Sequence, residues 1–236
     1  MEVKIMYGTA AEQEQEAKNS IDDFGGMKNA FDFESEIQYL TVIGSIEGHN
    51  VMAPDVKTTK YENMIPQLIA VQENPKIRGL LVVLNTVGGD VEAGLALAEL
   101  IASLTKPVVS VVLGGGHSIG IPLATAADYS FIAPSAAMTL HPVRMTGLMI
   151  GAEQTYGYFR KMQERITDFI VRTSGADRGT VVELMNSRND MANDIGTILY
   201  GEEAVKSGLI DRVGGIADAL KKLRELIGDR MRRTEI

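Results

Sequence analysis

The stretch that decides the fold runs from residue 79 to residue 104 and reads GLLVVLNTVGGDVEAGLALAELIASL. Its first six residues form a short, continuous apolar run, which is typical of a strand buried on both faces. A glycine-containing turn is predicted at 85–90. The alanine- and leucine-rich segment 91–104 then predicts a helix that ends at Thr105-Lys106-Pro107. A strand followed directly by a helix is the repeating unit of parallel α/β proteins.

The same alternation continues on both sides of this unit. Runs rich in β-branched and apolar residues predict strands, and apolar residues at helical spacing predict helices. The expected strands are 39–46, 108–113, 130–132, 138–140, 197–200 and 209–213, and the expected helices are 61–71, 119–127, 153–171, 178–187, 202–207 and 215–227. We therefore expect one α/β domain over 37–236, with a largely parallel sheet covered by helices.

The acidity of the chain is concentrated at its N-terminus. The net charge of the 236 residues is −8, and residues 1–36 alone hold nine acidic and three basic side chains. This segment has no apolar period, so we expect an acidic, mobile leader before the domain. The remainder is nearly neutral. Because a nucleic-acid binder needs clustered cations, we expect no nucleic-acid partner.

Several classes of function are excluded by what the sequence lacks. There is no cysteine, which rules out disulfides and a cysteine nucleophile, and there are only three histidines. No basic-then-apolar segment suggests a secretory signal, so a cytoplasmic location is expected. The uncharged stretch Pro107–Ala127 approaches the length of a membrane span, but its glycines and prolines favour a strand, a turn and a buried helix. We expect no membrane span.

The clearest catalytic pattern is Gly116-His-Ser-Ile-Gly120, which matches G-x-S-x-G between a predicted strand and a predicted helix. Small flanking residues allow a tight turn that exposes the Ser118 hydroxyl, as a nucleophile requires. The alternative is structural: Ser118 could simply cap the following helix.

A serine nucleophile needs a base, and His141 is the one histidine downstream of Ser118. It follows the predicted strand 138–140, at a strand end where parallel α/β folds place their sites. His49 is expected on a surface turn. His117 adjoins Ser118, and neighbouring residues on a tight turn point apart, so a local structural or tuning role is expected for it.

Acyl transfer also needs backbone N–H groups to bind an oxyanion. The turn Asn85–Asp90 has the character of an anion-binding strand-to-helix turn, or else it is a plain turn with Asp90 as helix cap. Its spacing is not that of a dinucleotide fingerprint. His141 follows Ser118 too closely for the Ser–acid–His order of α/β-hydrolases, so the acid should follow His141, with Asp190 and Asp194 as candidates.

Four ordered motifs resemble those of the ClpP-type serine peptidases, and most closely the translocation-enhancing members of that family. They are Asn85–Gly94, the Ser118 turn, Met138–His141 and Glu202–Asp211, and the resemblance covers about 37–225. It implies a ClpP/crotonase-like fold of repeated ββα units with a protruding handle, formed here by the strand-like 145–151 and the helix from Glu153. It also implies a ring-forming homo-oligomer, heptameric or of stacked rings, that cleaves peptides or unfolded protein segments inside a chamber.

Carried over residue by residue, the resemblance implies Ser118 as nucleophile, His141 as base, and the N–H groups of Gly88 and Ile119 as the oxyanion hole. It favours Asp194 as the acid, with Asp190 in reserve. No cofactor or metal is implied.

Three features depart from the family pattern. Thr86-Val87 replaces the usual Ser-Pro, His117 stands where a small residue is usual, and the acidic leader is unlike the hairpins that meet an ATPase. An ATPase partner is therefore not predicted.

Two other functions remain open at this point. A crotonase-type acyl-CoA hydratase or isomerase would use a similar glycine-lined hole, but it needs a catalytic glutamate, and none lies near 114–120. A non-catalytic ClpP-like scaffold is the other, and the intact Ser118 and His141 weigh against it.

Overall fold

A computed structural model describes residues 35–144, 151–188 and 195–234 of the chain. The acidic leader, most of the expected strand-like segment 145–151 and both candidate acids lie outside these residues. Strands and helices alternate along most of the described chain, as the sequence predicts. The elements are β1 (Ile37–Glu47), β2 (Thr58–Lys60), α2 (Tyr61–Glu73), β3 (Gly79–Gly89), α3 (Val91–Ala102), β4 (Val108–Gly116), α4 (Gly120–Thr125), β5 (Tyr129–Ile132), β6 (Ala137–Leu140), α5 (Ala152–Thr173), α6 (Arg178–Asn186), β7 (Thr197–Tyr200), α7 (Gly201–Lys206), β8 (Arg212–Val213) and α8 (Ile216–Thr234).

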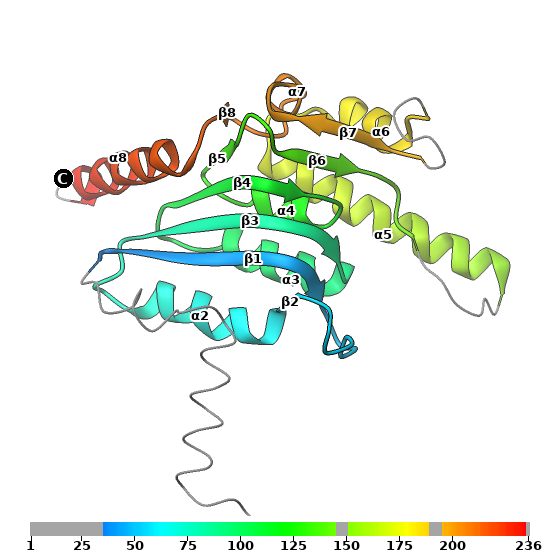
Figure 1. The fold of residues 1–236 in the computed structure, drawn as a ribbon, viewed down its shortest axis with the longest axis horizontal. Helices are drawn as coiled ribbons and strands as arrows, with labels where there is room; N and C mark the ends of the chain where they lie inside the picture. Colours follow the sequence, from blue (N-terminus) through cyan, green and yellow to red (C-terminus); the bar gives the residue numbers. More distant parts are fainter. Residues whose placement is uncertain (1–34, 145–150, 189–194, 235–236) are drawn as a thin grey trace, which may run out of the picture. The chain divides into compact units, whose positions relative to one another are not determined.

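The main sheet is parallel and its strands follow the order β2-β1-β3-β4-β5-β8 (Figure 1). A short strand, β6, leaves this order: it pairs with the end of β4 and, in antiparallel fashion, with β7. The mixed α/β fold with a mostly parallel sheet confirms the predicted fold class. In Pro107–Ala127, β4 is followed by a turn and the buried α4, as expected. Among the described helices, none is both long and apolar enough to cross a membrane.

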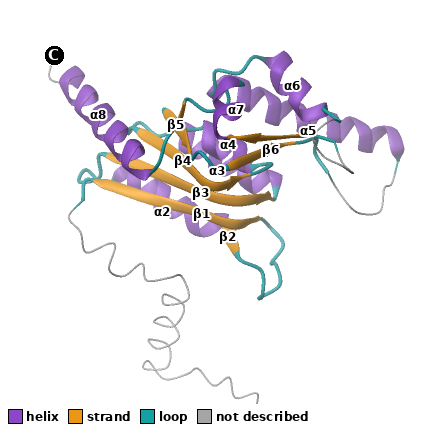
Figure 2. Cartoon of the chain, turned by 45° about the horizontal axis from the view of Figure 1, so that its top comes forward, coloured by secondary structure: helices purple, strands orange, loops and turns teal. Residues whose placement is uncertain are grey.

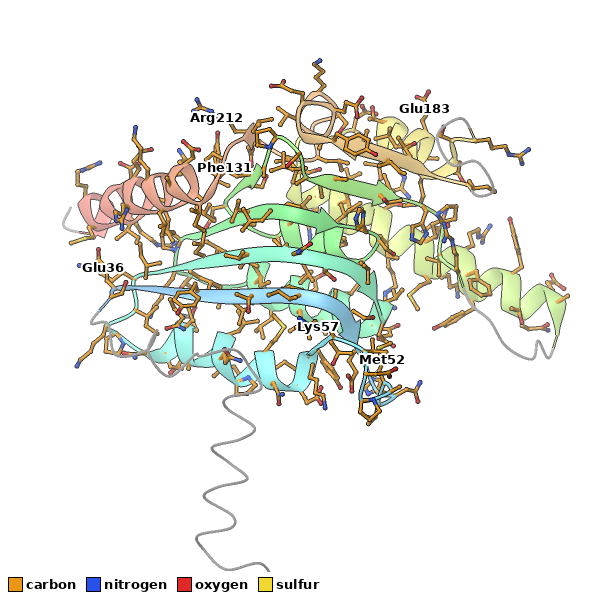
Figure 3. The ribbon with its side chains drawn as sticks, viewed as in Figure 1. Glu36, Met52, Lys57, Phe131, Glu183 and Arg212 are labelled. Carbon is orange, nitrogen blue, oxygen red and sulfur yellow. The ribbon has the colours of Figure 1, made fainter. Side chains whose placement is uncertain are left out.

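Helices cover both faces of the sheet. Alternate residues of β3 point to opposite sides, so that Leu80, Val82 and Leu84 join the large core with α2, α3, α4 and α5, whereas Leu81 joins a smaller core under α8. The two layers are visible in Figure 2, where α8 lies apart from α2 and α3. Phe131 belongs to the smaller core and pairs with Arg212 at the β5–β8 edge, where both are labelled in Figure 3.

The two central strands are longer than the sequence predicts. The stretch Asn85–Gly89, expected as a turn, continues β3, and residues 114–116 continue β4. Strand β3 is extended because its register against β1 shifts after Gly44. This shift lets Gly88 and Gly89 pair with Ser45 and Ile46. Both glycines have positive φ, 87° and 153°, a conformation that only glycine adopts readily. The pairing therefore carries the β3 backbone into the region of the Ser118 turn.

Candidate active site

The Ser118 turn has a strained backbone, as turns that carry a nucleophilic serine often do, and Ser118 is half-buried. Among the residues that the structure describes, Ser118 alone has a positive φ without being glycine, at 55°. Such a conformation costs on the order of 1–2 kcal/mol and concentrates at functional sites. The Ser118 N–H donates to the Thr139 carbonyl of β6 at 2.8 Å, and the Ile121 N–H donates to the Ser118 carbonyl at 3.0 Å. Long-range and local hydrogen bonds together hold the strained residue.

The structural alternative for Ser118 is wrong. Helix α4 begins at Gly120, its N-cap residue is Ile119, and no side chain makes a capping hydrogen bond there. For Asn85–Asp90, the alternative is a plain turn with Asp90 as helix cap. The cap is present, because the Asp90 side chain accepts from the Ala93 N–H at the start of α3 at 2.9 Å. The Ser118 hydroxyl is thus not used by the helix that follows it.

His141 lies where the sequence predicts, directly after β6, and it shares a cavity with Ser118. The cavity has a volume of about 170 Å³. The Nδ1 atom of His141 lies 2.7 Å from the Pro142 carbonyl oxygen. Because a carbonyl only accepts, this contact places the ring proton on Nδ1 and leaves Nε2 as the basic nitrogen. In the described part of the chain, no hydrogen bond joins His141 to the Ser118 Oγ.

The rest of the cavity is mostly apolar. Strand β6 and helices α3, α5 and α6 contribute to its wall together with the segment after His141, and its lining residues are Gly89, Val91, Ser118, Ile119, Leu140, His141, Pro142, Val143, Arg144, Ile166 and Met185. Burial of aliphatic surface is favourable at roughly 25 cal/mol per Å². The cavity therefore suits an aliphatic side chain held beside the nucleophile.

The two candidate oxyanion donors lie on either side of Ser118 but differ in their partners. A Cβ atom placed on Gly88 would lie 2.7 Å from the Ser118 Cβ, so the β3 backbone directly contacts the nucleophile. The Gly88 N–H donates to the Thr86 Oγ1 at 3.1 Å. The Ile119 N–H has no hydrogen-bond partner among the described residues, whereas the neighbouring turn N–H groups of His117, Ser118 and Gly120 all have one.

Both candidate acids, Asp190 and Asp194, lie outside the described residues. The described residues that flank them are close to the site: the Gly196 N–H donates to the Ser187 carbonyl at 2.8 Å, and a Cβ on Gly196 would lie 2.8 Å from the His141 Cβ. The described residues on either side of 189–194 are therefore hydrogen-bonded to each other, and Gly196 lies beside His141.

The other two histidines have the local roles that the sequence suggests. His49 lies on an exposed loop, with its Nδ1 3.2 Å from the Tyr61 hydroxyl. His117 is half-buried, and its Nδ1 lies 2.8 Å from the Thr139 Oγ1. Burial lowers the pKa of His117 below its ordinary value, and the neighbouring His141 lowers it further. At neutral pH His117 is therefore uncharged and does not oppose a positive charge on His141.

The lowered pKa of His117 predicts a loss of stability in mild acid. Below the ordinary histidine pKa of about 6.5, the unfolded chain gains a proton at this position before the folded protein does, so the free energy of unfolding decreases as the pH falls. The decrease is complete once the pH is below the lowered folded-state pKa. His117→Gln should reduce the drop in melting temperature between about pH 7.5 and pH 5.5. Equal drops for wild type and His117→Gln would contradict the prediction.

Thr86 and Thr139 are site residues that sequence reasoning missed. Thr139 accepts the Ser118 N–H and contacts His117, and Thr86 holds the Gly88 N–H. Both lie inside motifs that were recognised for their neighbours, Asn85–Gly94 and Met138–His141, but only strand register shows that they contact the Ser118 turn and the Gly88 amide. In the described part of the chain, no three His, Asp or Glu side chains are grouped so that they could hold a metal ion.

Comparison with known proteins identifies the family. A family model described as Clp protease matches residues 38–216. The chain is 57% identical over 194 residues to the translocation-enhancing protein TepA of Halalkalibacterium halodurans, covering 82% of this chain and 76% of that protein. It is 27% identical over 140 residues to the ATP-dependent Clp protease proteolytic subunit 1 of Chlamydia abortus, covering 57% of this chain and 69% of that one. The fold, the four motifs and these matches agree, and the chain belongs to the Clp protease family, with TepA among its relatives.

Proposed function

We propose that the protein is a serine endopeptidase of the ClpP type. The observation that carries the proposal is the strained Ser118 turn, whose hydroxyl caps no helix and which shares one cavity with His141. The Ser118 Oγ attacks the carbonyl carbon of the scissile peptide bond while His141 Nε2 takes its proton. The tetrahedral oxyanion is bound by the N–H groups of Ile119 and Gly88.

Collapse of this intermediate completes the first half of the reaction. The protonated His141 gives its proton to the leaving amine, the C–N bond breaks, and an acyl group remains on Ser118. Water, deprotonated by His141, then attacks the acyl carbonyl. The bond to the Ser118 Oγ breaks, His141 returns the proton to that oxygen, and the second product leaves as a carboxylic acid. The mechanism needs no cofactor. The aliphatic cavity favours substrates with an apolar side chain next to the cleaved bond, presented by peptides or unfolded segments.

Assembly into a homo-oligomeric ring is part of the proposal. The half of the sheet face not covered by α8 presents the exposed side chains of Ile43, Val87 and Leu113, at 47%, 65% and 41% exposure. Exposed apolar surface on a regular sheet favours contact with a second copy. We propose that the sites face an inner chamber, that the protein acts in the cytoplasm, and that it contributes to protein translocation, as the name of the relative TepA suggests.

The experiment that tests this function is labelling with a fluorophosphonate, which reacts covalently with activated serines. The probe is added to the assembled fraction after separation by size, and the modified residue is identified by peptide mass spectrometry. We expect one adduct per chain, on Ser118, and none in Ser118→Ala. An assembled wild-type protein that remains unlabelled and inactive on peptides would leave a ClpP-like scaffold as the correct description.

The identity of the acid can be tested separately. Because Gly196, two residues after Asp194, contacts His141, we expect Asp194 to share the Nδ1–H of His141 with the Pro142 carbonyl and so to orient the imidazole. Asp194→Ala should lower kcat by about 10³–10⁴-fold. Asp190→Ala is the matched control and should stay near wild type. Loss of activity in Asp190→Ala alone would reassign the acid to Asp190, and full activity in both variants would show that neither carboxylate has this role.

A further inference from the structure

Thr86 lies at the centre of the site, although the sequence marks it only as a departure from the family pattern. It sits in β3 between two strands, paired with Gly44 of β1 on one side and Gly116 of β4 on the other. Its side chain is 1% exposed. A buried hydroxyl must find partners within the protein, because an unsatisfied one costs about 1–3 kcal/mol.

The partners of this hydroxyl fix its direction. The Thr86 Oγ1 donates to the Gly44 carbonyl oxygen at 2.6 Å. The carbonyl cannot donate, so the single hydroxyl proton is committed to Gly44, and the lone pairs of the Oγ1 face the Gly88 N–H, which donates to it at 3.1 Å. Thr86 therefore bridges β1 and the oxyanion-hole backbone through one oxygen atom.

Thr86 also contacts the other half of the site. Its carbonyl accepts the His117 N–H at 3.1 Å, which anchors the start of the Ser118 turn. Its Cγ2 lies 2.7 Å from where a Cβ on Gly120 would be, so the methyl group packs tightly beneath that turn. One residue thus sets the position of the nucleophile turn and of the Gly88 amide that faces it.

The two candidate oxyanion donors differ in their hydrogen bonding because of the contact between the Thr86 hydroxyl and the Gly88 N–H. The Ile119 N–H has no partner in the described structure, whereas the Gly88 N–H is already engaged by the Thr86 hydroxyl. A neutral substrate carbonyl is no better an acceptor than this hydroxyl. A hydrogen bond to an oxyanion is charge-assisted and roughly twice as strong. The Gly88 amide therefore turns to the substrate only when negative charge develops.

We propose that Thr86 is a positioning residue of the oxyanion hole, which holds the Gly88 amide in the resting site and releases it to the tetrahedral oxyanion. This inference rests on the proposed peptidase function. The effect is selective for the transition state, since the second donor engages there and not with the bound substrate. Without the hydroxyl, the Gly88-Gly89 backbone loses the contact that fixes its position beside Ser118.

The test compares Thr86→Val, which keeps the shape and loses the hydroxyl, with Thr86→Ser, which keeps the hydroxyl. Thr167→Val is the matched control, because Thr167 is also buried, at 2% exposure, and its hydroxyl donates to the Gln163 carbonyl in α5. Thr86→Val should lower kcat by about 10–100-fold with KM unchanged, less than the loss of a whole oxyanion donor. A peptide boronate, which mimics the tetrahedral species, should bind more weakly by the same factor. Thr86→Ser and Thr167→Val should stay within about 3-fold of wild type.

Hydrogen–deuterium exchange measures the contact itself, independently of activity. The Gly88 amide should exchange faster in Thr86→Val than in wild type, and Thr86→Ser should restore slow exchange. Unchanged exchange and unchanged kcat in a folded Thr86→Val would overturn the inference. If Thr86→Val does not fold, Thr86→Ser tests the inference instead. This variant keeps the hydroxyl, so faster Gly88 exchange or a lower kcat in Thr86→Ser would also overturn the inference. A wild type that shows neither peptidase activity nor serine labelling contradicts the proposed function instead, and the exchange comparison still decides whether the hydroxyl holds Gly88.

Discussion

Ser118→Ala should lower peptide hydrolysis by at least about 10³-fold, and His141→Ala should have a comparable effect. In the proposed mechanism, Ser118 supplies the atom that forms the acyl-enzyme, and His141 is the base that makes its hydroxyl nucleophilic. Because both act in one step, the double variant should be hardly slower than either single variant. The measurement is kcat/KM on a fluorogenic peptide with an aliphatic residue before the cleaved bond.

Matched controls separate catalysis from folding in this experiment. Ser207→Ala removes the hydroxyl that donates to the Ala204 carbonyl at the end of α7, and His49→Ala removes the imidazole of an exposed loop. Both should keep wild-type activity. The prediction fails if Ser118→Ala retains more than about one part in a hundred of the activity, or if the two single losses multiply in the double variant.

Gly88→Ala should lower kcat by about 10²–10³-fold, the range seen when one oxyanion-hole donor is removed. The new Cβ would lie 2.7 Å from the Ser118 Cβ and 2.8 Å from the His117 carbonyl oxygen, distances that no relaxed structure allows. The φ of 87° adds backbone strain for any residue other than glycine. The β3 backbone must therefore move away from the nucleophile, and its N–H moves with it.

The control for this substitution is Gly157→Ala, on the protruding helix α5. Apart from its chain neighbours and the nearby backbone of α5 itself, no atom of the described residues lies within 4 Å of the added Cβ there. Alanine favours a helix over glycine by roughly 1 kcal/mol. We expect full activity and a slightly raised melting temperature. Thermal unfolding of Gly88→Ala, measured in parallel, shows what fraction of the variant is folded. A folded Gly88→Ala variant with the kcat of the wild type would exclude Gly88 from the oxyanion hole.

Much of the fold is predictable because it depends on local patterns. Apolar runs and helical spacing correctly locate β1, β3, β4 and the long helix α5, although element ends shift by several residues. Helix α8 is longer than predicted and ends at Thr234, although its residues in the small core under the sheet all lie within the predicted range 215–227. Strand β3 is longer because its second half is held by pairing with β1. Strand pairing is non-local, so propensity alone gives no signal of it.

The sequence by itself determined the alternation of strands and helices and the place of the Ser118 turn, and it supports the predictions of an acidic leader and of His141 as base. Each of these follows from local composition, spacing or scarcity. Only the tertiary structure decided what surrounds them. The hydrogen bond from Ser118 to Thr139 places the end of β6, and with it His141, beside the nucleophile. The register of β1 against β3 places Thr86 and Gly88 there too. Contacts of this kind join residues far apart in the chain, and they depend on register and side-chain direction, which no local stretch encodes.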